Sequence, residues 1–248
     1  MRLGAVFRSW KAWLAIVVVA VLSVPVSLYA AAGYFDRDPV HLFGEIDRPE
    51  PIAAVLFSGD MGLRFGLGPY VANAMADRGV PVLGVASPTQ FRFRRTRAEV
   101  DAIVANGIRE TLAKTGARKV IVIGQSFGSD IARVGLVDLP ADLRAKVASV
   151  VLVVPGQTAF FRADPSGLAY RGAPDAGPAE ARRLDWIRLT CIRGAAETDS
   201  LCPSLTMPNV RTVSLPGGHF LNSDHSRLIA TVLGALAHLL PPPTRIPS

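Results

Sequence analysis

The sequence predicts an α/β fold, with a mainly parallel sheet of about six strands and helices on both of its faces. Short, continuously apolar runs alternate along the chain with longer amphipathic segments at helical spacing. Strands that are apolar on both sides belong to parallel sheets covered by helices. The length of 248 residues, 50% of them hydrophobic, suits one domain with a full core. We expect this domain to cover residues 52–240.

The predicted elements follow one another in a regular strand–helix order. Buried strands are expected at residues 53–57, 81–86, 119–123, 147–154, 186–193 and 210–215. Helices are expected at residues 67–78, 96–115, 127–137 and 223–239, and the first two are followed by Gly79 and Gly116. Residues 155–185 are rich in Gly, Pro, Ala and Arg and have no periodic pattern, so their role stays open.

Residues 1–33 have the pattern of an export signal or a membrane anchor. Three basic residues precede an uncharged apolar run over residues 12–33. Its length favours an uncleaved anchor, whereas Ala30-Ala31-Ala32 offers the small residues of a signal-peptidase site. Because a basic flank stays cytoplasmic, the domain is expected in the periplasm, anchored by residues 12–33 or released by cleavage. A linker over residues 34–51 and a proline-rich tail over residues 241–248 flank the domain.

The net charge of +7 does not indicate a nucleic-acid-binding protein. The first eleven residues carry three basic groups and no acidic one, which leaves 24 basic and 20 acidic residues in the remainder. Such a mild excess does not argue for nucleic acid, and an anionic membrane surface is the more natural partner. Two cysteines are too few for a four-cysteine zinc site, and no motif indicates a cofactor or a metal.

The strongest chemical signal is Gly124-Gln125-Ser126-Phe127-Gly128, which lies between a predicted strand and a predicted helix. In this context the pattern G-x-S-x-G places the serine on a sharp turn, where its hydroxyl is exposed as a nucleophile. The flanking glycines let the strand and the helix pass closely. We therefore expect Ser126 to be the nucleophile of a serine hydrolase.

A serine nucleophile needs a base and a carboxylate that orients the base, in the chain order Ser, Asp or Glu, His. His219 follows the last strand, after two glycines, and is the predicted base. Two carboxylates, Asp199 and Glu197, lie in the loop after the fifth strand. We favour Asp199, because a short carboxylate followed by Pro203 resembles the usual acid turn of this fold, and keep Glu197 as the alternative.

The oxyanion hole is expected to use backbone N–H groups from two places. One is Phe127, directly after the nucleophile, and the other is Asp60 or Met61 in the loop after the first strand. Backbone donors leave no side-chain signature, so both residues of that loop stay candidates.

Four arginines are interleaved with aromatic residues in Phe91-Arg92-Phe93-Arg94-Arg95-Thr96-Arg97, directly after the second strand. They are expected at the same edge of the sheet as the other site residues. Arg92, Arg94 and Arg95 are candidate substrate-binding residues, because guanidinium groups suit a phosphate or a layer of lipid headgroups. The alternative is a solvated loop that leads into a helix.

Cys191 and Cys202 bracket the loop that carries both candidate acids. In an exported protein two such cysteines are expected to form a disulfide, which would hold the acid near His219. Two unpaired buried thiols are the alternative.

A set of short segments gives the chain a family resemblance. They are Phe57-Ser58-Gly59-Asp60, Arg78-Gly79-Val80-Pro81-Val82, the loop 91–97, Ser126-Phe127-Gly128-Ser129-Asp130, Cys191, Asp199-Ser200-Leu201-Cys202-Pro203 and Leu215-Pro216-Gly217-Gly218-His219. Over about residues 52–236 the chain resembles the bacterial virulence protein VirJ family. The resemblance implies an α/β-hydrolase fold, a periplasmic location and hydrolysis of the aminoacyl ester on phosphatidylglycerol. Met61 replaces a family glycine, and Gln125 replaces a tyrosine, which makes Gln125 a candidate for substrate choice.

We therefore predict a periplasmic serine esterase that cleaves lysyl- or alanyl-phosphatidylglycerol with Ser126, His219 and Asp199. One alternative is another exported esterase, thioesterase or acyltransferase. The other is a non-catalytic scaffold of the same fold, associated with a secretion system or other envelope proteins, as the virulence connection of the family suggests.

Overall fold

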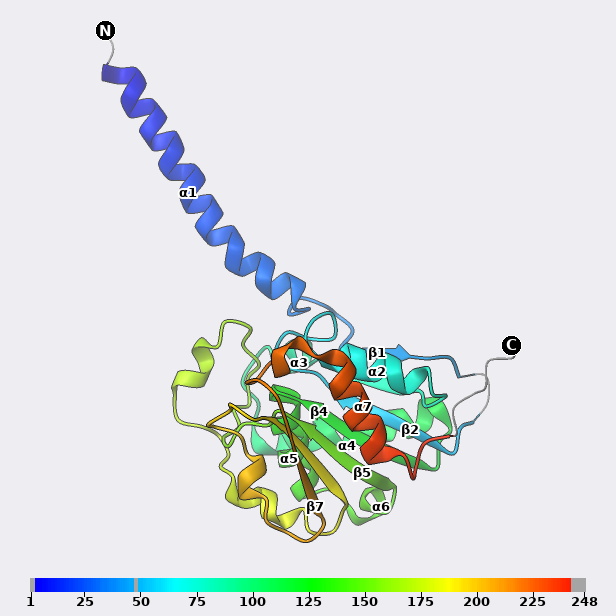
Figure 1. Cartoon of the computed structure of the whole chain (residues 1–248). Coiled ribbons are helices and arrows are strands. Elements are labelled where there is room, and N and C mark those ends of the chain that lie inside the picture. The colour runs from blue at the N-terminus through cyan, green and yellow to red at the C-terminus, as the bar shows by residue number, and fades with distance from the viewer. Residues whose placement is uncertain (1–2, 47–48, 242–248) are drawn as a thin grey trace.

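The protein is an α/β domain preceded by one long helix (Figure 1). The structure is a computed structural model that describes residues 3–46 and 49–241. Seven strands within these residues form one sheet: β1 (Val40–Phe43), β2 (Ile52–Phe57), β3 (Val82–Val85), β4 (Lys119–Gln125), β5 (Val147–Val153), β6 (Leu189–Gly194) and β7 (Val210–Leu215). Their order is β1-β3-β2-β4-β5-β6-β7, and β1 pairs antiparallel with β3 while the other pairs are parallel. The predicted mainly parallel sheet is confirmed.

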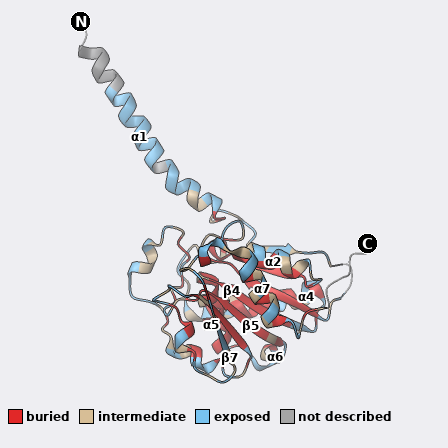
Figure 2. Ribbon diagram, viewed as in Figure 1, coloured by how far each residue is buried: buried red, intermediate tan, exposed pale blue. Residues whose placement is uncertain are grey.

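Helices cover both faces of this sheet, as predicted. The core on one face contains residues of α4 (Arg97–Thr115) and α5 (Phe127–Val137), and the core on the other contains residues of α2 (Gly68–Ala76) and α7 (His225–Leu236). Successive residues of β2 alternate between the two cores, with Val55 in the first and Leu56 in the second. The strands are therefore buried from both sides, which Figure 2 shows as a red sheet between the helices. This explains why their sequences are continuously apolar.

Short helices occupy several of the connections. They are α3 (Ser87–Gln90), α6 (Ala141–Arg144) and four 3₁₀ turns, η1 (Leu168–Arg171), η2 (Ala179–Arg183), η3 (Cys202–Ser204) and η4 (Leu221–Ser223). Two of them, η1 and η2, lie in the segment 155–185, where the sequence predicts no regular element. An isolated bridge between Ala159 and Ala176 joins the two limbs of this segment.

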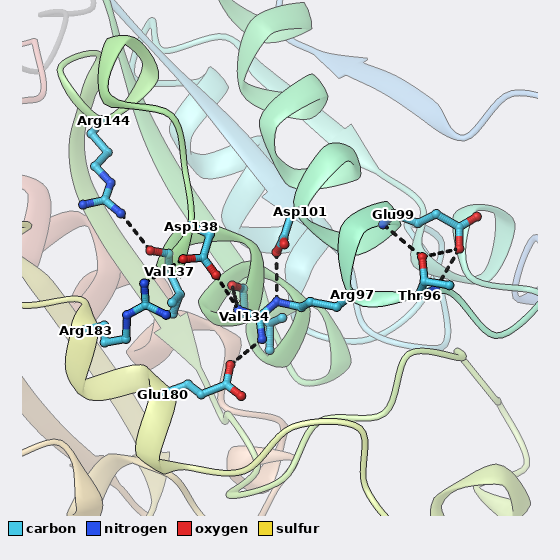
Figure 3. A network of polar contacts seen from close by, with 10 residues as sticks. All are labelled: Thr96, Arg97, Glu99, Asp101, Val134, Val137, Asp138, Arg144, Glu180 and Arg183. Atoms are coloured by element: carbon cyan, nitrogen blue, oxygen red, sulfur yellow. Dashed lines mark hydrogen bonds and ion pairs between the residues drawn. The ribbon is translucent and has the colours of Figure 1, made fainter.

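Local signals in the sequence account for the ends of α4. Thr96 and Glu99 form a reciprocal capping box, in which each side chain bonds to the backbone of the other residue (Figure 3). Such a cap stabilises a helix by about 1 kcal/mol. The helix is followed by Gly116, which adopts a positive φ of 66°. The structure therefore begins α4 within one residue of the predicted range.

The N-terminal part of the domain differs from the prediction. β1 lies inside the segment 34–51, which the sequence predicts to be a linker. The strand is short and forms an edge of the sheet, so it lacks the continuous apolar run of the buried strands. The predicted strand at 186–193 begins at Leu189. Residues 242–248 of the predicted proline-rich tail lie outside the described part of the chain.

The first helix, α1 (Leu3–Ala31), projects away from the domain (Figure 1). Its 22 residues from Trp10 to Ala31 are long and apolar enough to cross a membrane. At 1.5 Å per residue they extend about 33 Å, which matches the hydrocarbon thickness of about 30 Å. The described side chains from Trp10 to Val26 are exposed, so they pack on no part of the domain.

Candidate active site

The topology of the sheet places the candidate site at the carboxyl ends of β2 and β4. The chain passes from β2 to β3 on one side and then returns to β4 on the other side of β2. Loops that leave neighbouring strands in opposite directions open a crevice, which is the usual ligand site of such sheets. The loop after β2 contains Asp60, and Ser126 directly follows β4.

Ser126 lies on a strained turn between β4 and α5. Its φ of 53° and ψ of −124° are unusual for a residue that is not glycine. The turn is held by close packing, because a Cβ at position 128 would overlap the carbonyl oxygens of Phe57 and Ser58. The N–H of Ser126 also bonds to the carbonyl of Val153, at 2.8 Å. Gly128 therefore allows the first turn of α5 to approach the end of β2 closely.

The structure brings Ser126, His219 and Glu197 into one hydrogen-bonded row. The hydroxyl Oγ of Ser126 lies 2.7 Å from Nε2 of His219, and Nδ1 of the same ring lies 2.8 Å from Oε1 of Glu197. The preference for Asp199 as the carboxylate partner is therefore corrected in favour of the alternative. Asp199 is exposed, and its backbone carbonyl accepts a hydrogen bond from the N–H of Gln157.

The turn after β6 explains why the longer carboxylate reaches the imidazole. The N–H of Glu197 bonds to the carbonyl of Gly194, and Oε2 of Glu197 accepts the N–H of Gly194 at 2.7 Å. The N–H of Ala196 bonds to the carbonyl of Gly217, which ties this turn to the loop that carries His219. The Glu197 side chain is only 4% exposed, so both of its oxygens are held in fixed directions.

These contacts change the protonation of the site. The hydrogen bond that Nδ1 of His219 donates to Glu197 raises the pKa of His219 above its ordinary value, although burial opposes the change. The carboxylates of Asp130 and Asp199 act on the imidazole in the same direction as Glu197. Burial raises the pKa of Asp130, in the first turn of α5, to about 7. The pKa values of both groups therefore lie above their ordinary values.

The predicted disulfide is present. Cys191 in β6 is bonded to Cys202 in η3, and both residues are buried. The bond closes the chain around the turn that carries Glu197 and Asp199. The expected bracing of the acid loop therefore applies to Glu197 rather than to Asp199.

The loop after β2 packs closely against Gln125. The N–H of Gly59 points at Oε1 of Gln125, at 3.3 Å, and a Cβ at position 59 would lie 3.0 Å from the same atom. Gln125 is buried and belongs to the lining of the cavity at Ser126. Its amide thus supports the loop that presents Asp60 and Met61, both of which also line the cavity.

A cavity of about 1170 Å³ opens above Ser126. Its apolar lining includes Phe65, Leu67, Phe127, Phe160 and Phe220. Besides Glu197, three carboxylates line it: Asp60, Asp130 and Asp199. Burial raises the pKa of Asp60, which is half-buried. Among the described residues, no group of three or more His, Cys, Asp or Glu side chains is placed to hold a metal ion.

Comparison with known proteins identifies the family. A model of the bacterial virulence protein (VirJ) family matches residues 51–239. This chain belongs to the VirJ family. The match covers the whole sheet except β1 and includes every residue of the row at Ser126. No curated protein matched the sequence of this VirJ-family chain.

Solved structures show that the VirJ-family chain has the α/β-hydrolase fold. XC6422 from Xanthomonas campestris, an α/β serine hydrolase without a lid, is 17% identical with a TM-score of 0.54, over 82% of this chain and 89% of that one. Est1E from Butyrivibrio proteoclasticus is 13% identical with a TM-score of 0.56, over 80% and 94% of the two chains. The esterase domain of a Rhodothermus marinus protein is 17% identical with a TM-score of 0.53, over 81% and 92%.

The arginines of the predicted substrate-binding loop do not line the cavity of the VirJ-family chain. Arg92 donates to the carbonyls of Thr89 and Asp36, and Arg95 donates to the carbonyl of Gln90 and to Glu99. Arg94 pairs with Asp175. The next arginine, Arg97, pairs with Asp101, Asp138 and Glu180 (Figure 3). These contacts hold the arginines outside the cavity lining. Several of the partners are distant in sequence.

One residue of the site was missed by the sequence analysis. Tyr170, in η1, packs its ring against Phe127 and Phe160, and its hydroxyl donates to Oδ2 of Asp60 at 3.2 Å. It comes from the segment 155–185, whose composition gives no signal for a contact with the loop after β2. The segment 155–185 therefore forms one wall of the cavity.

Proposed function

We propose that this VirJ-family protein is a serine hydrolase of carboxylic esters, and that its substrate is an aminoacyl-phosphatidylglycerol. The row from Ser126 through His219 to Glu197 is the single observation that carries the proposal. It joins a hydroxyl, a base and a buried carboxylate at hydrogen-bond distances, in the chain order of the α/β-hydrolase fold.

The proposed reaction follows from the directions of these bonds. Ser126 Oγ attacks the ester carbonyl and transfers its proton to Nε2 of His219, while Glu197 holds the Nδ1 proton. The backbone N–H of Phe127, together with that of Asp60 or Met61, stabilises the oxyanion. His219 then protonates the leaving glycerol oxygen, and a water molecule releases the amino acid from Ser126.

The lining of the cavity supports a cationic acyl group. A lysyl or alanyl ester carries an ammonium group beside the scissile carbonyl, and Asp60 and Asp199 place carboxylates in the same cavity as Ser126. The apolar lining, which includes Phe65 and Phe220, suits the glycerolipid part of the substrate. The helix α1 supports the proposed periplasmic location at a membrane.

The decisive assay measures release of lysine or alanine from aminoacyl-phosphatidylglycerol by the wild-type protein and by Ser126→Ala. We expect release by the wild type and no reaction with the variant. A fluorophosphonate probe should label the wild type alone, which also separates an enzyme from a scaffold. Equal release by both proteins would contradict the mechanism. Labelling without release would contradict the substrate and favour another exported esterase, thioesterase or acyltransferase.

Asp60→Asn tests the recognition of the ammonium group. Losing a charge-assisted contact should raise KM for a lysyl ester about tenfold. The matched control is an acetyl ester of the same alcohol, whose KM should not change because it carries no cation. A similar rise in KM with both esters would show that the variant disturbs the oxyanion loop instead.

A further inference from the structure

The C-terminal end of α1 is attached directly to the rim of the catalytic cavity. We call residues 29–36 the anchor junction. The hydroxyl of Tyr29 donates to the carboxylate of Asp164 and lies 3.2 Å from Oγ of Ser166. Ser166 belongs to the lining of the cavity. The last turns of the apolar helix therefore contact the same segment that forms one wall of the site.

A second set of contacts fixes the junction to the loop after β2. Arg64, another residue of the cavity lining, donates to the carbonyls of Ala30 and Ala31 at 3.4 Å and to Asp36 at 2.8 Å. A cation at this position also suits the negative end of a helix dipole. A Cβ at Gly62 would overlap the carbonyl oxygen of Ala32, so the loop accommodates the helix end closely.

The junction leaves no flexible linker between the membrane-spanning segment and the domain. The apolar segment ends at Ala31, and Ala32 and Gly33 are already buried. The hydroxyl of Thr89 donates to the carbonyl of Gly33 at 2.8 Å. Tyr29 and Tyr34 lie on either side of this point, where aromatic residues commonly mark the boundary between lipid and water. The rim of the cavity therefore lies within a side chain's length of that boundary.

Exposed apolar side chains occur in the lining of the cavity and in the segments next to it. Phe65, Tyr70 and Phe220 line the cavity and are nevertheless exposed, with 72% of Phe220 accessible. Leu168, in the wall segment beyond Ser166, and Phe35, in the anchor junction, are also exposed. Exposed apolar side chains beside a helix long enough to span a membrane suit insertion among lipid headgroups and chains.

We propose that α1 is retained as an anchor and that its junction holds the mouth of the cavity against the membrane surface, so that a lipid ester enters from the adjacent leaflet. This inference rests on the proposed function, because it needs Ser126 to be reactive. It adds to that function the direction from which the substrate enters, and it assigns to the anchor junction the role of fixing this direction. The exposed apolar side chains at the mouth of the cavity contact the same lipid bilayer that α1 spans.

The experiment uses the full chain in proteoliposomes and a membrane-impermeant fluorophosphonate that carries a fluorophore. Reaction with Ser126 forms the Oγ–phosphorus bond and releases fluoride, while His219 takes the hydroxyl proton. Energy transfer from the bound fluorophore to acceptors on the lipid headgroups then reports the height of the cavity above the membrane. Hydrolysis is measured in parallel on a lipid ester in the same vesicles and on a soluble short-chain ester.

Two insertion variants form a matched pair. About ten Gly and Ser residues are inserted either after Leu28 or after Glu45, which adds about 17 Å of flexible reach at each place. The insertion after Leu28 separates the apolar helix from the whole anchor junction, whereas the insertion after Glu45 leaves the helix joined to the junction and every contact of the junction in place. Glu45 is exposed and lies outside the strands, so the control is expected to fold.

The insertion after Leu28 should reduce energy transfer and lower the rate on the lipid ester about tenfold, because the local concentration of lipid at the mouth falls. Its rate on the soluble ester should stay that of the wild type. The insertion after Glu45 should change none of the three values, and the intact mass of the wild type should include α1. Equal energy transfer and equal lipid rates in both insertion variants would overturn the inference, as would a mass lacking α1. Failure of the probe to label Ser126 would instead overturn the proposed function, and this inference with it.

Discussion

The carboxylate that orients His219 is the residue with the sharpest expected effect. Glu197 holds Nδ1 at 2.8 Å, whereas Asp199 is exposed and bonds through its backbone. We expect Glu197→Gln to lower kcat on a neutral soluble ester by about 10³–10⁴-fold, because the amide favours the wrong tautomer of the imidazole. Asp199→Asn should lower it by less than about threefold, because the charge of an exposed carboxylate is screened by solvent. A larger loss with Asp199→Asn than with Glu197→Gln would contradict the assignment.

The raised pKa of His219 determines the direction of the pH dependence. The ring acts as a base only when neutral, so kcat/KM should rise with pH through the pKa of His219, above the ordinary value of 6.5. Removing the charge of Glu197 removes the largest cause of the raised pKa. The inflection in Glu197→Gln should therefore move to lower pH, measured as kcat/KM on a neutral ester. Since Asp130 and Asp199 also raise the pKa of His219, Asp199→Asn should move the inflection in the same direction.

The residues of the site differ in how far the sequence could predict them. Ser126 and His219 were predictable, because a G-x-S-x-G turn between strand and helix and the order of the loops define their places. The selection of Glu197 over Asp199 depends on the backbone path from Gly194 to Glu197, which sequence spacing alone does not give. Tyr170 reaches Asp60 across 110 positions of chain, from a segment without periodicity.

At the scale of elements, the disulfide between β6 and η3 is the main covalent brace of the site. Closing so short a loop stabilises the fold by about 3 kcal/mol in the chain-entropy model. The double variant Cys191→Ala, Cys202→Ala should therefore lower Tm by about 6–12 °C, measured by thermal unfolding. Reductant should lower the Tm of the wild type similarly and leave that of the variant unchanged. An unchanged Tm of the wild type after complete reduction of the disulfide would contradict this role.

The buried strands and the edge strand were not equally predictable. β4 and β5 show their burial on both faces as continuous apolar runs, and their predicted ranges agree with the structure to within two residues. β1 has only four residues and pairs on one side, so its pattern is masked by the polar residues around it. The contacts of the arginine loop were not predictable for a related reason. Asp175 and Glu180, the partners of Arg94 and Arg97, lie about 80 residues away and are brought close only by folding.

At the scale of the whole molecule, the chain should be held to membranes by α1 rather than by its charge. The net charge is +7, but several arginines of the domain, Arg94, Arg95 and Arg97 among them, are paired internally. We expect the protein to stay in the membrane fraction in about 1 M NaCl, where the Debye length is about 3 Å. Immunoblotting of the washed membranes measures this. Release by salt would indicate that charge, and not the helix, holds the protein.

The short junction between α1 and the domain has a kinetic consequence. A catalyst whose entrance is fixed at a bilayer encounters its substrate by lateral diffusion, in two dimensions. Its rate then depends on the mole fraction of the ester in the leaflet and not on the bulk amount of lipid. Diluting the proteoliposomes with buffer should leave turnover per protein unchanged, whereas diluting the ester with inert phospholipid in the same leaflet should lower it in proportion.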